Sequence, residues 1–257
     1  MSLILPTTAT YFRCYLEAVE KSLQACSVVP DEVIVVVSGG LANLTTLPFQ
    51  VPAPSRSSIL SVATKLCASE ARNLGAAMAT SDILSFFDFD DIIHPRRFEV
   101  IQAVFQDATL DAALFRYQIW NGKGLPVHQP LNISTSSIKA RFRYTEIRKG
   151  YVKSLGKKFG KSVPLPWLAK LWCCHFIGER KVANGWLTVR RSVFFQFMYR
   201  VGPGCKRDKG VINERGEDSD LNARISLAGY NFTTFGIELG SVRKLPRHKG
   251  LSPFERC

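Results

Sequence analysis

The sequence lacks a long apolar run, since its longest purely apolar stretches are about five residues where a membrane-spanning helix needs about 20. It also lacks basic residues ahead of its first apolar stretch, where a secretory leader carries them. None of its 7 cysteines forms a Cys-x-x-Cys pair, and their odd number argues against a disulfide framework and against a zinc site. We therefore expect a cytoplasmic protein in a reducing compartment, with peripheral attachment to a membrane left open.

The chain does have enough apolar residues for a full core, together with a strong excess of basic ones. Its 257 residues are 46% hydrophobic with a mean hydropathy of +0.02, which predicts a single domain over residues 1–257. The net charge of +13 is concentrated between Lys139 and Lys161, where nine Lys or Arg residues stand against Glu146 alone. Nucleic acid, anionic lipid or an acidic sugar acceptor would each suit such a segment, and so would plain solvation.

Strand and helix patterns alternate through the first half of the chain. Apolar and β-branched residues predict strands at 3–5, stopped by Pro6, at 33–37 and at 83–87, with amphipathic helices between them. This alternation predicts an α/β protein with a Rossmann-like, doubly wound fold. Its central sheet would be mostly parallel, with helices on both faces and ligands beyond the carboxyl ends of the strands.

Other segments are less regular. Ser69 is expected to cap the helix before the acidic strand, and Pro95 to open the helix after it. Residues 41–58 are expected to form a loop with one short strand at 47–51. In the second half, we expect two strands and two helices, at 112–117, 185–190, 192–199 and from Glu217 to Gly229.

The strand at 83–87 leads into three carboxylates, Asp88, Asp90 and Asp91. Side chains two apart on an extended chain point to the same side, so Asp88 and Asp90 should converge. Two hard oxygen ligands at a sheet edge suit a divalent cation, and such a cation suits a phosphate. The alternative is that Asp91 caps a helix starting near Pro95.

A second acidic cluster opens a predicted helix at Glu217, Asp218 and Asp220. Acidic side chains in the first turn are stabilised by the helix dipole, and Gly229 is a typical helix stop. The dipole favours the ionised carboxylate, which lowers its basicity slightly.

The order of these motifs resembles that of the inverting, family 2 type of nucleotide-sugar glycosyltransferase, which has the GT-A fold. The resemblance covers about residues 2–105 and 182–250 and leaves the basic stretch unmatched. In the first half it rests on a strand ending in Pro-Thr (Pro6 to Thr7), an Ala-Arg-Asn-x-Gly motif (Ala71 to Gly75) and an Asp-x-Asp-Asp motif (Asp88 to Asp91). In the second half it rests on a Gly-rich strand followed by Arg-Arg (Asn184 to Arg191). It also rests there on Gly-Glu-Asp-x-Asp-Leu-x-x-Arg (Gly216 to Arg224) before Ala-Gly-Tyr (Ala228 to Tyr230).

The resemblance implies roles for the residues in these motifs. Asp90 corresponds to the ligand of a Mn²⁺ or Mg²⁺ ion that holds the diphosphate, and Asp88 to the acid that touches the ribose or the metal. Arg72 corresponds to a residue near the nucleotide. Asp218 corresponds to the catalytic base, and Glu217 to a neighbour that orients the acceptor.

Further donor contacts are implied at Pro6, Thr7 and Ser38, at the ends of the first two long strands. Family members usually carry Asp at the position of Ser38, where it holds the base of the nucleotide. Because Ser38 cannot form that contact, Asp31 or a backbone group is expected to replace it. His248 corresponds to a late basic residue that closes on the metal or the diphosphate in some relatives.

The resemblance also implies a division of labour and a set of partners. Residues 1–117 would bind the nucleoside-diphosphate sugar, and residues 118–257, with the basic insertion 139–161, would bind the acceptor. That acceptor is expected to be a glycan or a lipid-linked molecule, as in polysaccharide biosynthesis. Contact with an anionic membrane or an acidic acceptor would suit the basic insertion.

Two other functions compete with this interpretation. A phosphatase of the haloacid-dehalogenase type also has Asp-x-Asp after an apolar strand, but its nucleophile follows the first strand of the sheet, whereas two strand-helix units precede Asp88. A nucleic-acid-binding protein would use the basic segment 139–161. We disfavour the phosphatase for this reason, although it also has a later acidic pair, and because Ile92 stands where a small hydroxylated or branched residue is usual. We also rank nucleic acid below a sugar donor as the partner.

Overall fold

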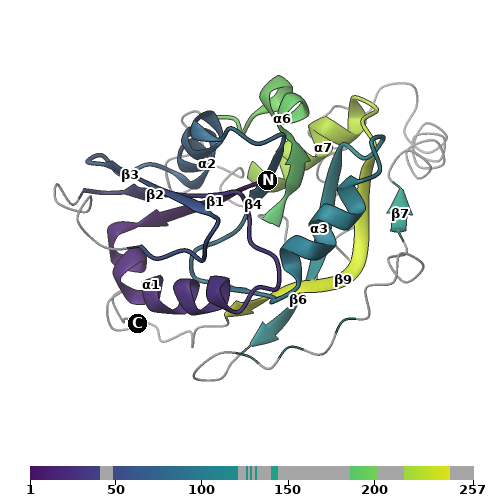
Figure 1. Cartoon of the computed structure of the whole chain (residues 1–257). Coiled ribbons are helices and arrows are strands. Elements are labelled where there is room, and N and C mark those ends of the chain that lie inside the picture. The colour runs from purple at the N-terminus through teal and green to yellow at the C-terminus, as the bar shows by residue number, and fades with distance from the viewer. Residues whose placement is uncertain are drawn as a thin grey trace.

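A computed structural model of the chain describes residues 1–40, 49–120, 126, 128, 131, 140–143, 186–201 and 217–243. Within these residues, nine strands form one sheet in the order β3-β2-β1-β4-β8-β6-β9-β5, and β7 pairs with β9. Helices cover both faces of the sheet (Figure 1). The α/β class predicted from the sequence is confirmed.

The N-terminal half of the sheet is parallel throughout. β1 pairs with both β2 and β4, and β2 pairs with β3. Pro6 lies inside β1 and does not stop it, because the pairing of β1 with β4 covers only Ser2 to Ile4 and the missing N–H of Pro6 is not needed. The four strands are Ser2–Thr8 (β1), Glu32–Ser38 (β2), Arg56–Val62 (β3) and Ile83–Phe86 (β4).

β3 corrects the prediction of a strand at 47–51. The strand lies at Arg56–Val62, at the edge of the sheet, and its residues are exposed or only half-buried. Its sequence has the polar run Arg56, Ser57 and Ser58 in place of a clear apolar alternation. An edge strand with little buried surface therefore gave too weak a hydrophobic pattern to be located.

Two helices, α1 and α2, connect strands of the N-terminal half, and a third, α3, leads from β5 to β6. Thr8 caps α1 by accepting a hydrogen bond from the Tyr11 N–H at 3.3 Å. Cys67, and not Ser69, caps α2, and the Glu70 carboxylate completes the cap by accepting from the Cys67 N–H at 2.8 Å. The helix expected after Pro95 begins two residues later. The bounds are Ala9–Gln24 (α1), Ala68–Met78 (α2) and Arg97–Phe105 (α3).

The C-terminal half of the sheet is mixed. β8 is antiparallel to β4 and β6, whereas β9 is parallel to β6 and antiparallel to β5 and β7. The strands are Ile92–Ile93 (β5), Ala112–Trp120 (β6), Ala140–Arg143 (β7), Thr188–Arg190 (β8) and Phe232–Arg243 (β9). The helices are Arg191–Phe197 (α6) and Glu217–Leu227 (α7).

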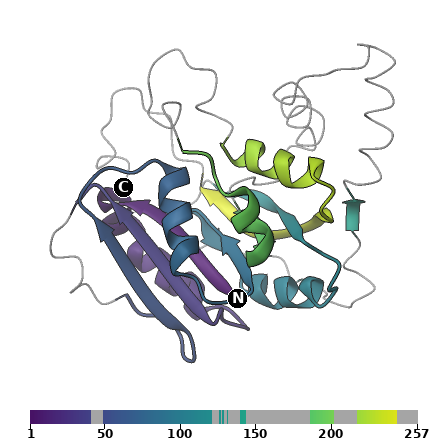
Figure 2. The ribbon, with the colours of Figure 1, turned by 90° about the horizontal axis from the view of Figure 1, so that it is seen from above.

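Two hydrophobic layers enclose the sheet. Along β2, Val33, Val35 and Val37 belong to the layer that includes residues of α1 and α3, whereas Ile34 and Val36 belong to the layer that includes residues of α2, α6 and α7. Figures 1 and 2 show these two groups of helices on opposite faces of the sheet. A strand buried on both faces reads as a continuous apolar run, which explains why β2 was located from the sequence.

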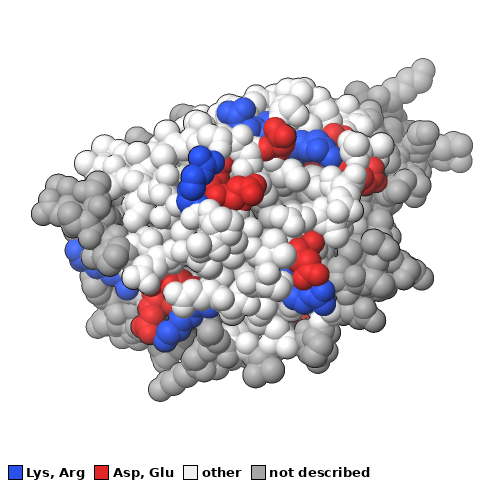
Figure 3. Space-filling model, in the orientation of Figure 1, with Lys and Arg blue, Asp and Glu red and all other residues white. Residues whose placement is uncertain are grey.

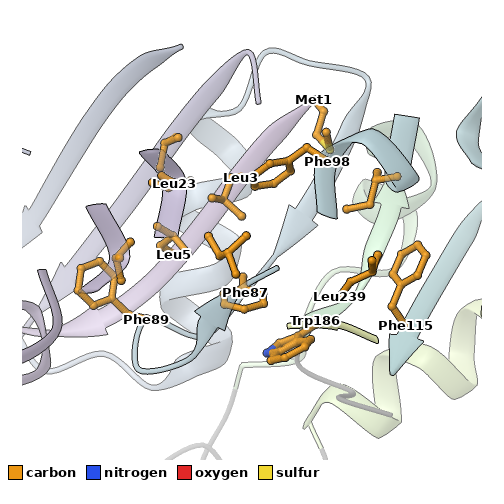
Figure 4. Packing of buried hydrophobic residues seen from close by; sticks show 14 of the residues in the cluster. Met1, Leu3, Leu5, Leu23, Phe87, Phe89, Phe98, Phe115, Trp186 and Leu239 are labelled. Atoms are coloured by element: carbon orange, nitrogen blue, oxygen red, sulfur yellow. The ribbon is translucent and has the colours of Figure 1, made fainter. Parts of the chain in front are cut away.

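Trp186 joins the two halves of the sheet in the first of these layers. Its ring stacks on Phe87 with centroids 4.4 Å apart, and both are fully buried near Leu239 (Figure 4). Gly240 of β9 makes room for this ring, because a Cβ there would lie 2.6 Å from Trp186 Cη2. Trp186 therefore holds the segment after β4 close to β9.

The described cysteines differ in their bonding. Cys14, on α1, and Cys67, at the start of α2, are each disulfide-bonded, whereas Cys26 is free. This corrects the expectation that all the cysteines stay reduced.

Among the described helices, none has the length and apolar character that a membrane span requires.

Candidate active site

Arg72 lies at the centre of a buried group of charges. The residue is only 4% exposed, and its guanidinium binds carboxylates on two sides. Nη2 donates to Asp88 Oδ1 at 2.8 Å and Nη1 to Asp218 Oδ1 at 2.9 Å, and Glu217 Oε1 lies 3.7 Å from Nη1. Burial alone would lower the pKa of Arg72, but these carboxylates raise it, so the guanidinium stays charged. Residues that are far apart in the sequence therefore meet at one cation.

The Ala-Arg-Asn-x-Gly motif on α2 gives Arg72 its position. Gly75 lets the helix approach the sheet, because a Cβ there would lie 2.5 Å from Ile4 Cγ2 and 3.2 Å from Val36 Cγ2. Asn73 binds the backbone of Tyr199 twice, donating to its carbonyl at 2.8 Å and accepting from its N–H at 3.0 Å. The motif thus combines a charged residue, a backbone clamp and a close helix-to-sheet contact.

The Asp-x-Asp-Asp motif forms a turn directly after β4. The Asp91 N–H donates to the Asp88 carbonyl at 3.2 Å, so the motif is not the extended chain from which the convergence of Asp88 and Asp90 was argued. The two carboxylates are nevertheless close enough to interact. Burial raises the pKa of Asp90 to about 6, and the charge of Asp88 raises it as well, whereas Arg243 lowers it. A nearby cation would therefore stabilise the ionised form of Asp90.

Asp91 has a structural role that differs from the predicted helix cap. Its carboxylate accepts from Trp186 Nε1 at 3.0 Å and from the Arg243 N–H at 3.2 Å. Burial raises its pKa well above the usual range, with the charges of Asp88 and Asp90 as further causes. Asp91 therefore fixes the turn to Trp186 and to β9, and the cap interpretation is wrong.

Asp218 and Glu217 begin α7, as the sequence predicts. Burial raises the pKa of Asp218 to about 6, Arg72 lowers it, and the charges of Asp88 and Glu217 raise it again. The Asp218 side chain is still 21% exposed and so remains within reach of a small molecule. A carboxylate that is largely buried, held by one cation and titrating near neutrality has the properties of a general base.

Tyr199 is a member of this group that the sequence analysis did not identify. It follows α6, is 3% exposed, and its ring lies over the Arg72 guanidinium with Cζ 5.3 Å from the ring centroid. Its hydroxyl has no hydrogen-bond partner of normal geometry among the described residues, but it is close enough to Asp218 to lower the pKa of that carboxyl. No motif marks the position, since the only local signal is an aromatic residue after an amphipathic helix.

The residues expected to bind the nucleotide lie at the carboxyl edge of the sheet. Pro6 and Thr7 are near the end of β1, and Ser38, the last residue of β2, pairs with Thr8. In the described part of the chain, no hydrogen bond or ion pair connects these three residues to Arg72 or its carboxylates. Asp31 is wrong as a substitute for the missing Asp, because it precedes β2 at the opposite edge and pairs with the N-terminal amine of Met1.

Two expectations lie outside the described residues. His248, predicted to close on the metal or the diphosphate, is one, and the basic insertion 139–161 apart from β7 is the other. Within the described ranges, no group of three or more His, Cys, Asp or Glu side chains could hold a metal ion by itself. On the face shown in Figure 3, acidic and basic side chains lie next to each other and no patch of one sign forms.

An α/β sheet with an acidic turn after β4, an Arg joining it to an acidic helix start, and Pro-Thr at the end of β1 corresponds to the GT-A class of fold. The model of the family described as Glycosyl transferase family 2 matches residues 6–176. The chain belongs to this family. Asp88 follows the fourth strand in this fold, so the phosphatase alternative does not apply.

Solved structures of similar fold support the same class. Structures of S. aureus TarS residues 1–349 match with 13% identity and a TM-score of 0.58, and, in complex with UDP-GlcNAc, with 13% identity and a TM-score of 0.59. These matches cover 95% and 98% of this chain and 60% of those chains. A longer TarS structure matches at 15% identity and a TM-score of 0.59, with 37% of its length covered. A comparison with curated proteins finds no match.

Proposed function

We propose that the protein transfers a sugar from a nucleoside diphosphate to a hydroxyl acceptor, with the help of a divalent cation and with inversion of the anomeric centre. The observation that carries the proposal is the Arg72 bridge between Asp88 and Asp218. It joins the acid expected at the ribose or the metal on the donor side to the acid expected at the acceptor. A reaction that connects these two partners needs both acids in one site.

The donor is proposed to be a UDP-sugar. TarS, whose fold is similar, has been solved with UDP and with UDP-GlcNAc. Pro6, Thr7 and Ser38 lie at the strand ends where ligands of such sheets bind. Ser38 has no carboxylate for the uracil, so we assign this contact to a backbone carbonyl of the exposed turn at Gly39, because the Gly39 N–H already donates to the carbonyls of Val62 and Thr64 at 3.1 Å.

The carboxylates of the site suit a Mn²⁺ or Mg²⁺ ion. Asp88, Asp90, Glu217 and Asp218 outnumber the two neighbouring cations, Arg72 and Arg243, which leaves the group with excess negative charge. Such ions are often held by one or two carboxylates together with substrate phosphates, so a complete cage of protein ligands is not required. Asp90 would hold the ion with Asp88 beside it, and the ion would neutralise the charge that develops on the leaving diphosphate.

Asp218 is proposed to act as the base. Its ionised carboxylate takes the proton of the acceptor hydroxyl while the hydroxyl oxygen forms a bond to the anomeric carbon. The bond from that carbon to the diphosphate oxygen breaks, and its electron pair leaves with the diphosphate. Because attack and departure take place on opposite faces of the sugar, the product has the inverted configuration. Glu217, in the same turn of α7, is proposed to orient the acceptor.

Metal-dependent UDP binding is tested by the melting temperature of the protein with UDP, with and without Mn²⁺. A ligand that binds only the folded state raises the melting temperature by mass action. UDP with Mn²⁺ should raise the melting temperature of the wild type. Asp90→Ala should lose this increase, while its melting temperature without ligand should equal that of the wild type. Asp82→Ala, just before the start of β4, is the matched control and should keep the increment. Equal UDP affinity in the presence of a chelator would contradict the metal site.

The acceptor is proposed to be an anionic glycan or a lipid-linked molecule that contacts the basic segment 139–161. The argument is the density of Lys and Arg there, because the described fold has no such excess on the face of Figure 3. Neutralising four of these lysines should weaken acceptor binding and its dependence on salt, with donor hydrolysis little changed. Steep salt-dependent binding to DNA or RNA would instead indicate a nucleic-acid partner.

A further inference from the structure

The turn after α6, residues 197–200, is held from two sides by the two sequence motifs of the site. Asn73 of the Ala-Arg-Asn-x-Gly motif binds both the N–H and the carbonyl of Tyr199. From the other side, Arg224 of α7 donates to the carbonyls of Phe197 and Met198, the latter at 2.7 Å. Four hydrogen bonds to side chains of two helices therefore fix this short turn.

The conformation of the turn is itself unusual. Met198 has a φ of 38°, in a region that side chains larger than glycine rarely occupy. Such conformations cost free energy, persist only where the surroundings enforce them, and gather at functional sites. Here Asp220 binds Arg224 Nε at 2.8 Å and so orients the guanidinium that enforces the turn. These contacts also give Asp220 and Arg224, which belong to the same motif as Asp218, a physical role.

The result of this conformation is the placement of the Tyr199 ring. The ring packs edge-on against Phe86 at the end of β4, with centroids 5.5 Å apart, and covers the Arg72 guanidinium. Arg72 Nε has no hydrogen-bond partner among the described residues, so the Nη bonds to Asp88 and Asp218 do not by themselves fix the plane of the guanidinium. The ring supplies the missing constraint and keeps water from Arg72.

We propose that Tyr199 is a positioning residue for catalysis, which keeps Arg72 aligned between Asp88 and Asp218. This inference deepens the proposed function and rests on it, because it assumes that Asp218 is the base. Tyr199 does not touch the reacting atoms in this assignment. It acts through Arg72, and the clamp of the turn by Asn73 and Arg224 acts through Tyr199.

The test compares Tyr199→Leu, Tyr199→Phe and a control change at an aromatic residue of the preceding helix, Phe195→Leu. Phe195 is 36% exposed and packs on Arg191, away from Arg72. The first readout needs no substrate: the NMR signal of the Arg72 Nε–H, assigned with Arg72→Lys, reports whether the guanidinium is protected from exchange. The second is the turnover of a UDP-sugar, with kcat and KM measured separately.

Tyr199→Leu should lose the Arg72 signal and lower kcat by up to about 10²-fold with a smaller change in KM, as expected when a reacting group is misplaced. Tyr199→Phe keeps the ring, so it should retain the signal. It should also retain most of kcat at a pH well above the pKa of Asp218, which the hydroxyl lowers. Phe195→Leu should behave as the wild type. Asn73→Ala frees the turn without changing the ring, and it serves as a second variant if Tyr199→Leu does not fold.

Two results would overturn the inference. One is a protected Arg72 signal in Tyr199→Leu or, where that variant does not fold, in Asn73→Ala. The other is a loss of kcat in Tyr199→Phe as large as in Tyr199→Leu, which would assign the effect to the hydroxyl. The proposed function fails separately, by the absence of sugar transfer in the wild type, and the NMR comparison can be read in either case.

Discussion

The donor side and the base side of the site are built in different ways. Asp88 and Asp90 follow the short strand β4, and backbone pairing with β1 on one side and β8 on the other fixes where that strand ends. Asp218 begins a helix whose ties to the rest of the site are side chains, with Arg72 at one point and Arg224 at another. The donor side is therefore positioned by backbone hydrogen bonds, whereas the base side is positioned by side chains, namely the packing of Leu221 and Ile225 and a few charged contacts.

This difference predicts which substitutions should change stability and which should change the rate of transfer. A change in the packing under the donor side should lower the free energy of unfolding and leave the chemistry intact. A change at the base side should lower the rate and leave the fold intact. Arg72 belongs to both sides, because it stands on α2, which packs against β1 and β2, and binds the base. Breaking a buried ion pair by removing one partner costs about 3–5 kcal/mol, so Arg72 variants should lose stability and activity together.

The largest effect should come from Asp218→Asn. The amide keeps the shape of the side chain and its contact with Arg72, but it cannot accept the proton of the acceptor. Losing a positioned general base costs about 10²- to 10⁴-fold in rate. The measurement is the rate of sugar transfer, together with UDP affinity, which should stay close to that of the wild type, and melting temperature at pH 7, which should not fall.

The outcome that contradicts this role is specific. If Asp218 only caps α7, its loss should cost about 1 kcal/mol of stability and leave the rate unchanged. A variant that melts earlier and transfers sugar at the normal rate would make Asp218 a structural residue. The control is Asp82→Asn, a change of the same kind just before β4 and outside the contacts described above for Arg72 and Tyr199.

A smaller effect is expected from pH. Burial raises the pKa of Asp218 to about 6, and the base must be ionised to act, so the transfer rate should fall about tenfold per unit below pH 6. Stability should change in the opposite direction. A carboxyl group whose pKa is raised on folding binds more protons in the folded state, so its contribution to stability falls as pH rises from about 4 to about 6.

Rates and urea unfolding measured from pH 5 to 8 check both signs, with Asp218→Asn as the reference in which this contribution is absent. A rate that stays constant down to pH 5 would remove Asp218 as the titrating base. A wild-type stability that follows Asp218→Asn at every pH would show that its pKa is not raised in the folded state.

The sequence identified the donor side better than the base side for a physical reason. β1, β2 and β4 carry continuous apolar runs because they are buried on both faces, and each ends in polar residues at the functional edge. The carboxylates after β4 and at the start of α7 were found because both motifs are short and contiguous. The sheet order brings the two motifs together at Arg72. Neither motif by itself predicts this contact.

What the sequence did not indicate depends on long-range contacts. β9 has polar and glycine positions among its apolar ones, and its pairing with β6 is interrupted by register shifts, so no strand pattern was evident. The structural role of Asp91 depends on Trp186, 95 residues away. Tyr199 depends on Asn73 in the same way, 126 residues away. Local periodicity contains no information about such partners.

The smallest effect should come from Gly75→Ala, and it is confined to the donor side. The new Cβ would lie 2.5 Å from Ile4 Cγ2, so α2 must shift from β1 or Ile4 must change rotamer. Inserting a methyl group into a packed interior costs about 1–3 kcal/mol, which urea unfolding would detect. Leu74→Ala is the matched control, since Leu74 precedes Gly75 on α2, is 37% exposed, and should change the free energy of unfolding by no more than about 0.5 kcal/mol. If Gly75→Ala unfolds like the wild type but transfers sugar slowly, α2 moves without loss of packing, and its contact with the sheet serves the position of Arg72 more than the stability of the fold.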